Sequence, residues 1–372
     1  MLSPLPVTLP RLVVIAALLS STASRAADVI LAGSASLDYR LVSGAAPPTN
    51  PSPLGISGMT FELAQKVVVD VGHGVSFTVK ACGGCHGLEV DQGFGELHVR
   101  RFFNVRAGRL NVPVGEFTVR HDPTNFSTPS KPLPFAMGDM LQYGRSAFNL
   151  GIVPAPAIDN GVEVFGSLGL GKRVSLDYTV SLIKGLAGDN DLDFVRSRVW
   201  VDNNRTPAVA ARVVLTGPDW SFGASGTAGA YDSKDSLWYS IVGVEAYARL
   251  GIVTLRAEAL ARRTDLDATA TGYPFQLIDA WFLKAGWYAQ ADVQVHRLVT
   301  LVLRSDGLHR FGMPLPGSEL TSSSSGVQRQ TLAAFVRAND FVAFKADYEL
   351  WTFTGTTFPL RHVGRVALVL GY

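Results

Sequence analysis

The chain has 372 residues, of which 17% are charged, and its formal net charge is +2 at pH 7. That balance argues neither for nor against nucleic acid, but no basic cluster with interleaved aromatic residues is present, so we expect no nucleic-acid partner. Only two cysteines occur. One bridge cannot hold together a chain of this length, which excludes a disulfide-framework fold.

The first 26 residues have the pattern of a secretory signal peptide. Arg11 precedes an apolar run over residues 12–19, and Ser24 and Ala26 place small residues where a signal peptidase cleaves. The run of about eight apolar residues is too short to span a bilayer of roughly 30 Å. We therefore expect export through the Sec pathway, a signal peptide over 1–26 and a mature chain over 27–372.

After the signal peptide, hydrophobic residues are spread by alternation rather than gathered in runs. Mean hydropathy is positive, at +0.20, yet no stretch approaches the 18 uninterrupted apolar residues of a membrane helix. Alternation of apolar and polar residues is typical of β-strands with two different faces. With an error of about two strands, we predict sixteen strands, over residues 32–42, 56–70, 74–82, 87–99, 103–112, 160–170, 173–185, 205–217, 219–230, 236–250, 252–263, 279–295, 297–306, 327–337, 341–352 and 362–372.

Both cysteines lie in the stretch Ala-Cys-Gly-Gly-Cys-His-Gly, residues 81–87. The Cys-x-x-Cys-His spacing is that of a c-type haem attachment site, in which Cys82 and Cys85 bind the vinyl groups and His86 binds the iron. The alternative is a disulfide between Cys82 and Cys85 across a Gly-Gly hairpin turn, because such a turn brings its flanking residues close together. A structural zinc site is disfavoured, since zinc takes four protein ligands and no second cysteine pair is present.

The residues around the motif leave haem and disulfide both open. The chain has only 7 histidines, so a histidine directly after the second cysteine is unexpected by chance. A haem site requires His86 as the iron ligand, whereas a disulfide does not account for it, and His86 therefore favours haem. The flanking segments look like strands, however, and offer no helical pocket for a haem. The candidate sixth ligands of the iron are His73, Met137 and Met140, each of which is more often a packing residue.

Two long segments interrupt the predicted strands. Residues 113–159 include a stretch rich in Pro, Thr and Ser and are too long for a turn. In a pore-forming barrel, a long loop after an early strand can fold inward and narrow the pore, so this segment is our candidate constriction; a solvated surface loop is the alternative. Residues 186–204 form the second long loop, with room for one short extra strand.

The segments 237–250, 252–263, 281–295 and 342–352 show the alternation most clearly. Their apolar faces carry almost no charge, while the opposite faces carry charges of both signs, as expected for lipid outside and water inside a barrel. We therefore predict a set of channel-lining residues on the polar faces, namely Glu245, Arg249, Arg256, Glu258, Lys284, Asp292, Lys345, Asp347 and Glu349.

The strands of a soluble β-sandwich also alternate between apolar and polar residues. The lengths of the turns are therefore needed to distinguish a sandwich from a barrel. The short turns lie at Gly251, 296–298 and 338–340, and the long ones at 263–277, 307–326 and 353–361. Regular alternation of this kind matches short periplasmic turns and longer extracellular loops. The final aromatic residue, Tyr372, resembles the sorting signal of Gram-negative outer-membrane barrels. We predict an all-β fold: one transmembrane antiparallel β-barrel of about 16 strands (14–18), closed so that no strand edge is exposed.

Three segments resemble the phosphate-selective porin family. They are 95–117 (GELHVRRFFNVRAGRLNVPVGEF), 207–234 (PAVAARVVLTGPDWSFGASGTAGAYDSK) and the hairpin 243–258, together roughly a third of the chain. The resemblance implies sixteen strands, a homotrimer and passive diffusion through the barrel. It does not carry phosphate selectivity over, because a lining of mixed charge sets up no strong field of one sign. The Cys-x-x-Cys-His motif is not part of the family's usual pattern.

The sequence therefore favours a non-enzymatic outer-membrane channel for small polar or ionic solutes, carrying one c-type haem at Cys82, Cys85 and His86 if the haem interpretation holds. The alternative is a haem-bearing redox protein on a barrel scaffold, with periplasmic or surface cytochromes as partners. Neither a nucleophile elbow nor a complete phosphate-binding loop is recognisable. Beyond haem iron, we expect no metal.

Overall fold

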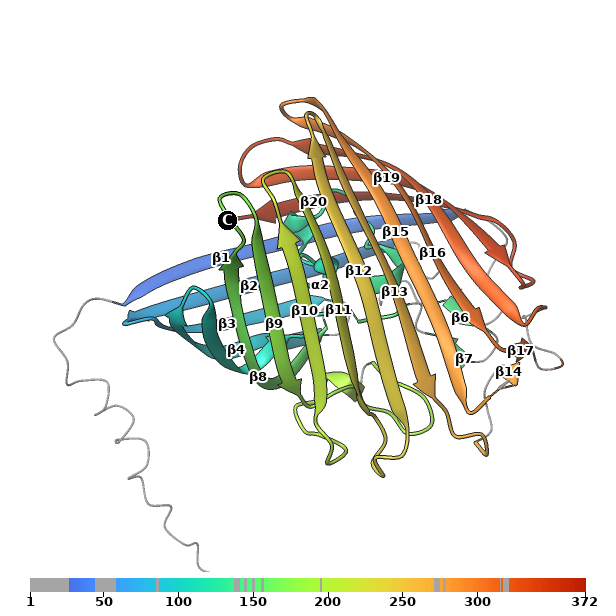
Figure 1. The fold of residues 1–372 in the computed structure, drawn as a ribbon. Helices are drawn as coiled ribbons and strands as arrows, with labels where there is room; N and C mark the ends of the chain where they lie inside the picture. Colours follow the sequence, from blue (N-terminus) through green and yellow to red (C-terminus); the bar gives the residue numbers. More distant parts are fainter. Residues whose placement is uncertain are drawn as a thin grey trace, which may run out of the picture.

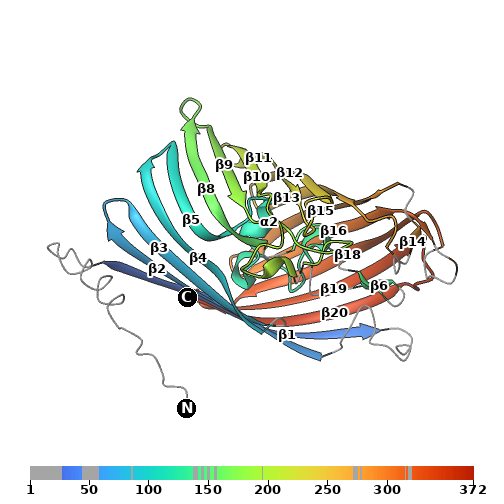
Figure 2. The same ribbon diagram turned by 90° about the horizontal axis from the view of Figure 1, so that it is seen from below.

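The computed structural model describes residues 27–43, 58–84, 87–136, 141–143, 146–148, 151–154, 157–194, 196–270, 275–276, 279–314, 316 and 321–372. Sixteen strands form one closed antiparallel barrel, in which each barrel strand pairs with the barrel strands before and after it and β1 pairs with β20 (Figures 1 and 2). The predicted all-β transmembrane barrel of sixteen strands is confirmed. Residues 1–26, the predicted signal peptide, lie outside the described residues.

The barrel strands are β1 (Asp28–Ser43), β2 (Gly58–Gly72), β3 (Val75–Gly84), β4 (Gly87–Arg100), β5 (Phe103–Asn111), β8 (Ile158–Gly169), β9 (Ser175–Ile183), β10 (Ala208–Thr216), β11 (Trp220–Ala230), β12 (Trp238–Leu250), β13 (Val253–Asp265), β15 (Trp281–His296), β16 (Val299–Phe311), β18 (Ser324–Arg337), β19 (Val342–Thr354) and β20 (Arg361–Gly371). Two small sheets pair β6 (Leu141–Tyr143) with β7 (Ser146–Phe148) and β14 (Phe275–Gln276) with β17 (Met313–Pro314). The short helices are α2 (Glu116–Val119), η1 (Pro123–Asn125), η2 (Leu133–Phe135) and η3 (Arg196–Arg198).

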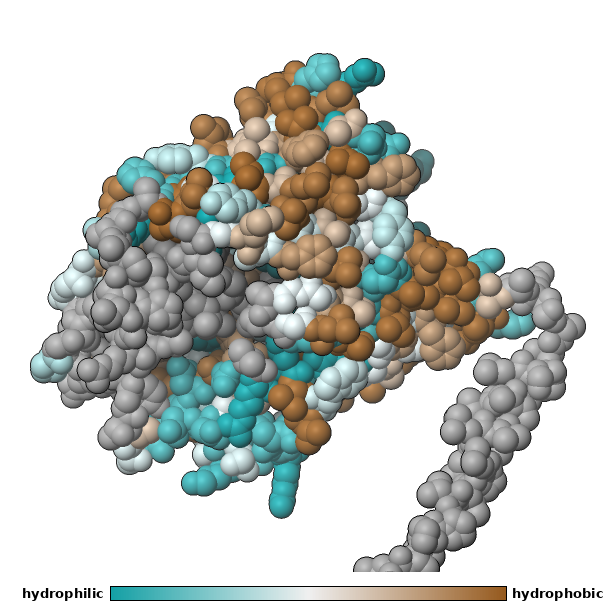
Figure 3. Space-filling view, turned by 180° about the vertical axis from the view of Figure 1, so that it is seen from behind, coloured by the Kyte–Doolittle hydropathy of each residue, from teal (hydrophilic) through white to brown (hydrophobic). Residues whose placement is uncertain are grey.

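The two faces of each strand divide as the alternation predicts. On β12, Val242 and Val244 are 61% and 49% exposed, whereas their neighbours Ile241 and Glu245 are buried. Successive side chains of a strand point to opposite faces, so the apolar set faces outward and the charged set inward. Figure 3 shows hydrophobic side chains gathered over a large part of the outer surface. In the part of the chain that the structure describes, no helix is long and apolar enough to cross a membrane.

The connections alternate between two ends of the barrel. The β2–β3, β12–β13 and β15–β16 turns lie at the same end as Tyr372, which we call the short-turn end. The connections β5–β8, β9–β10 and β13–β15 lie at the opposite, long-loop end, together with the turn between β3 and β4. Gly84 at the end of β3 and Gly87 at the start of β4 therefore lie at the end of the barrel opposite the C-terminus.

The long connection between β16 and β18 is shorter than expected. We predicted a loop over 307–326, but β16 continues to Phe311 and β18 begins at Ser324. Asp306 and Arg310 point inward and are buried among polar partners, so they can occupy a strand. Residues 186–204 contain η3 and one bridge between Gly188 and Leu192; no further strand occurs among the described residues of that loop.

Candidate functional site

The connection between β5 and β8 folds into the barrel. We call its described part, residues 112–136 and 151–154, the inward loop; Figure 2 shows α2 inside the ring of strands. Its side chains Phe117, Leu133 and Phe135 are at most 2% exposed and share one hydrophobic cluster with Tyr288 and Trp351 of the wall. The principal core of the described residues therefore lies inside the barrel, and the described part of this segment folds inward instead of forming a solvated surface loop.

A buried carboxylate of the wall holds the beginning of α2. Glu258 on β13 accepts hydrogen bonds from the backbone N–H groups of Glu116 (2.8 Å) and Phe117 (2.9 Å) and from the Tyr288 hydroxyl (2.5 Å). These amides belong to the first turn of α2, where no partner exists within the helix. Gly115 precedes them with φ of 74°, and a Cβ there would lie 2.6 Å from the Glu258 carboxylate. Only glycine suits that position.

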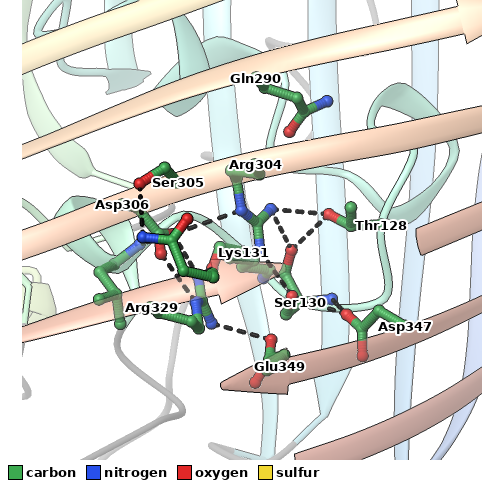
Figure 4. A network of polar contacts seen from close by, with 12 residues as sticks. Thr128, Ser130, Lys131, Gln290, Arg304, Ser305, Asp306, Arg329, Asp347 and Glu349 are labelled. Atoms are coloured by element: carbon green, nitrogen blue, oxygen red, sulfur yellow. Dashed lines mark hydrogen bonds and ion pairs between the residues drawn. The ribbon is translucent and has the colours of Figure 1, made fainter. Parts of the chain in front are cut away.

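Arg304 on β16 holds the middle of the inward loop (Figure 4). Its guanidinium donates to the Thr128 hydroxyl (2.8 Å), the Ser130 carbonyl (2.9 Å) and the Ser130 hydroxyl (2.6 Å). The Ser130 hydroxyl in turn donates to Asp347 on β19, at 2.8 Å. A single serine is therefore held by side chains from two strands.

Arg329 on β18 is the centre of the same network (Figure 4). It bonds Asp306 at 2.9 Å and Glu349 at 3.0 Å, and it also donates to the backbone carbonyl of Lys131 at 2.6 Å. Asp306 accepts the backbone N–H of Leu133 at 3.1 Å. The side chains of Arg329, Asp306 and Glu349 are fully buried. Because each charge has an opposite partner and further hydrogen bonds, the network can exist without contact with water.

Lys345 on β19 completes the attachment. Its ammonium donates to the carbonyls of Pro123 (2.6 Å) and Phe126 (2.5 Å), and it lies 4.3 Å from the centre of the Phe126 ring. Further along the wall, Arg262 donates to the carbonyl of Ile152 at 3.2 Å. The inward loop is thus attached from near its first residues to its last described ones.

These contacts place the predicted channel-lining residues. All nine lie on inward-facing positions, but most are covered by the inward loop and stabilise it instead of facing open water. Five of them, Glu258, Asp292, Lys345, Asp347 and Glu349, take part in the attachment or its ion pairs. Glu245 forms an ion pair with Arg212. Lys284 is buried, while the side chains of Arg249 and Arg256 stay partly exposed.

A different set of charges keeps contact with water inside the barrel. It comprises Glu62 on β2, Arg106 on β5, Arg212 on β10, and Glu116, Arg120, Asp122 and Lys131 of the inward loop. The strand residues could have been found from alternation, because Phe61 and Leu63 are strongly exposed and leave Glu62 pointing inward. No sequence pattern marks the loop residues, because their positions depend on how the loop folds against the wall.

The motif at 81–87 is described only up to Gly84. Cys82 is a half-buried, inward-facing residue of β3, opposite Ala64 and Glu89, and it has no disulfide partner among the described residues. Cys85 and His86 lie outside the described residues, as do Met137 and Met140, so haem attachment and the disulfide stay predictions. Within the described residues, no group of three or more His, Cys, Asp or Glu side chains is placed to hold a metal ion.

His73 lies far from the described part of the motif. It is in the β2–β3 turn at the short-turn end, whereas Cys82 is near the opposite end of β3. Nine residues separate His73 from Cys82 along an extended strand, about 30 Å, which is far beyond a bond to the same iron. His73 and Gly74 have φ of 56° and 77°, as the two central residues of a type I′ hairpin turn require. His73 is therefore a turn residue.

The β3–β4 hairpin contacts the inward loop beside a β-bulge. Lys80 pairs with Gln92 but Ala81 pairs with Val90, so Asp91 is the extra residue and points inward beside Gln92. The Lys80 ammonium lies 3.8 Å from Asp91 and 3.1 Å from His121 Nε2 of the inward loop, and it also pairs with Asp122. The inward loop is therefore attached to β3 as well as to the opposite wall.

No protein-family model matches the chain, and no curated protein matches it. Solved structures that resemble it are outer-membrane porins and related outer-membrane proteins. The anion-selective porin from Comamonas acidovorans has a TM-score of 0.62 at 13% identity, over 93% of this chain and all of the other. OmpF from Salmonella typhi, in complex with daunomycin, has a TM-score of 0.63 at 12% identity, over 92% and 97%. The trimer form of OmpT from Vibrio cholerae has 0.57 at 10%, over 93% and 100%. At these identities the likeness concerns the fold, and the fold of this chain is that of the outer-membrane porins.

Proposed function

We propose that this protein is an outer-membrane channel through which small polar or ionic solutes diffuse passively. The observation that carries the proposal is the inner surface of the barrel, where charged side chains partly exposed to water remain beside an inward loop that narrows the lumen. An apolar outer face and a polar interior are the arrangement of a water-filled barrel in a membrane. The likeness to porins supports the same conclusion.

We further propose that the channel has little preference for phosphate or for one sign of charge. Arg106 pairs with Glu163 at 2.7 Å, Arg256 with Asp292 at 3.1 Å and Lys131 with Glu62 at 3.3 Å. Arg120 and Arg212 likewise pair with Glu116 and Glu245. A ladder of cations that guides anions needs positive charges without such partners. The arrangement therefore supports a weakly selective channel for solutes of either charge.

The test is planar-bilayer recording of the purified full-length protein. We expect discrete conductance steps, with a reversal potential close to zero in a gradient of potassium chloride. Heat-modifiable migration on a gel shows that the barrel is folded, and the heat-denatured protein serves as the control. A folded, membrane-inserted barrel without any conductance would exclude the channel. A homotrimer, which the trimer form of a structural neighbour supports, is tested by crosslinking in the outer-membrane fraction.

Covalent haem at Cys82, Cys85 and His86 is a separate proposal, and with it the alternative of an electron-transfer protein acting with cytochromes. Cys82 faces the inside of the barrel at the long-loop end, so a haem bound there would occupy the lumen or its mouth. A haem peroxidase stain that disappears in Cys82→Ala supports haem. If the stain is negative and thiols appear only after reduction, the Cys82–Cys85 disulfide is correct instead.

A further inference from the structure

Lys131 of the inward loop is fixed at its backbone and extended at its side chain. Its carbonyl accepts the hydrogen bond from Arg329 on β18, whose side chain is fully buried. Its ammonium reaches Glu62 on β2, lying 3.4 and 3.3 Å from the two carboxylate oxygens. One residue therefore connects the attached side of the loop with a different part of the barrel wall.

The contact with Glu62 differs from the other attachments in its exposure. The side chains of Lys131 and Glu62 are 22% and 31% exposed. The charged inner-face residues of β16, β18 and β19 are at most 7% exposed; they are Arg304, Asp306, Arg310, Arg329, Lys345, Asp347 and Glu349. Water inside the barrel therefore reaches the β2 side of the loop and not the opposite side, and the Lys131–Glu62 pair stands in the part that water reaches.

We propose that the Lys131–Glu62 ion pair is a side-chain gate that sets the free width of the channel and its balance between anions and cations. The proposal rests on the channel function. An ion pair in contact with water is weak, and salt screens it further. Its side chains can therefore separate and rejoin while the backbone of the loop, attached through Arg329, stays in place.

Gly84 of the motif lies next to Glu62. A Cβ at Gly84 would lie 3.9 Å from Glu62 Cγ and 3.3 Å from the carbonyl of Phe61. A larger side chain at Gly84 would therefore pack against the Glu62 side chain, and glycine leaves that space open.

The test compares single-channel recordings of the full chain with those of Glu62→Gln and Lys131→Gln. We expect each substitution to raise the mean conductance about two- to six-fold, the range that follows from the closed-to-open ratio of an exposed ion pair. Glu62→Gln leaves a lone ammonium and shifts the reversal potential toward anions, whereas Lys131→Gln leaves a lone carboxylate and shifts it toward cations. In the unchanged protein, conductance rises more steeply than the conductivity of the solution between about 0.1 and 1 M salt.

The matched control is Asp189→Asn, because Asp189 forms an exposed ion pair with Arg196 in the other long loop, at 2.5 Å. If Glu62→Gln and Lys131→Gln conduct and select ions as this control does, the gate proposal is wrong, while the channel function still stands. Conductance in Glu62→Gln but not in the unchanged protein supports a closed gate. Absence of conductance from every folded variant defeats the channel and the gate together. Heat-modifiable migration of each variant shows that it is folded.

Discussion

Single charged residues in this barrel have roles that depend on whether water reaches them. Arg329 and Lys131 are both cations with acidic partners, yet the first is fully buried and the second keeps contact with water. A buried pair that loses one partner leaves an uncompensated charge in a medium that solvates it poorly, whereas an exposed pair costs little to break. A cation thus stabilises the inward loop at one position, whereas a cation that water reaches can move at another.

Arg329→Met tests the buried side of this contrast. The substitution leaves Asp306 and Glu349 without their shared cation and the Lys131 carbonyl without its donor. We expect the free energy of unfolding to fall by about 3–5 kcal/mol, measured by urea titration of the refolded barrel in lipid vesicles. Arg196→Gln removes an exposed cation from a surface pair and is the control; equal losses in the two variants would contradict the role of burial.

At the scale of elements, the position of α2 is decided by the strand that it contacts. Four helical residues are far too few to be stable alone. Glu258 on β13 supplies acceptors for the first amides of α2, and Phe117 packs against Phe135 at 5.3 Å between ring centres. The helix therefore forms because Glu258 of the wall bonds its first amides. The residue before the helix, Gly115, has to be glycine.

Gly115→Ala tests this attachment, with Gly171→Ala as its control. Both glycines have positive φ, 74° and 85°, so both substitutions carry a backbone cost, of order 1–3 kcal/mol. A Cβ at Gly171 meets nothing within 4 Å, whereas at Gly115 it lies 2.6 Å from Glu258. We expect Gly115→Ala alone to expose the inward loop to trypsin, followed by cleavage after Arg120, which precedes His121. Equal protection of the two variants would show that Glu258 does not fix the loop.

For the whole molecule, the apolar outer face and the charged inner face make the barrel stable with lipid outside and water inside. Val244 on β12 is 49% exposed on the outer face, and the next residue, Glu245, is buried on the inner face beside Arg212. Because the period of a strand is two residues, a shift of one residue would exchange the two faces along its whole length. A strand of the barrel thus tolerates a charged residue on its inner face and not on its outer face.

Val244→Arg and Ser221→Arg compare the two faces directly. Arginine at Val244 would face lipid and cost about 2–4 kcal/mol near the bilayer midplane. Ser221 lies between the exposed Trp220 and Phe222 and points into the lumen, so arginine there should change stability little. The measurement is the folded fraction in lipid vesicles as urea increases. Similar losses at both positions would refute the assigned faces.

The sequence alone indicated a closed barrel of about sixteen strands and the faces that side chains occupy on the strands with the clearest alternation. These follow from alternation and turn length, which are local properties of neighbouring residues. It also indicated that residues 113–159 could fold inward, but it left a surface loop equally open.

Only the tertiary structure decided which charges are buried and which meet water. Lys345 and Asp347 occupy inward positions of a strand, as Arg256 does, yet contacts with the inward loop bury the first two and leave Arg256 partly exposed. Those contacts join residues about 200 positions apart, such as Lys131 with Arg329 and Phe126 with Lys345. Burial depends on which distant segment covers a side chain, and no local pattern in the sequence contains that information.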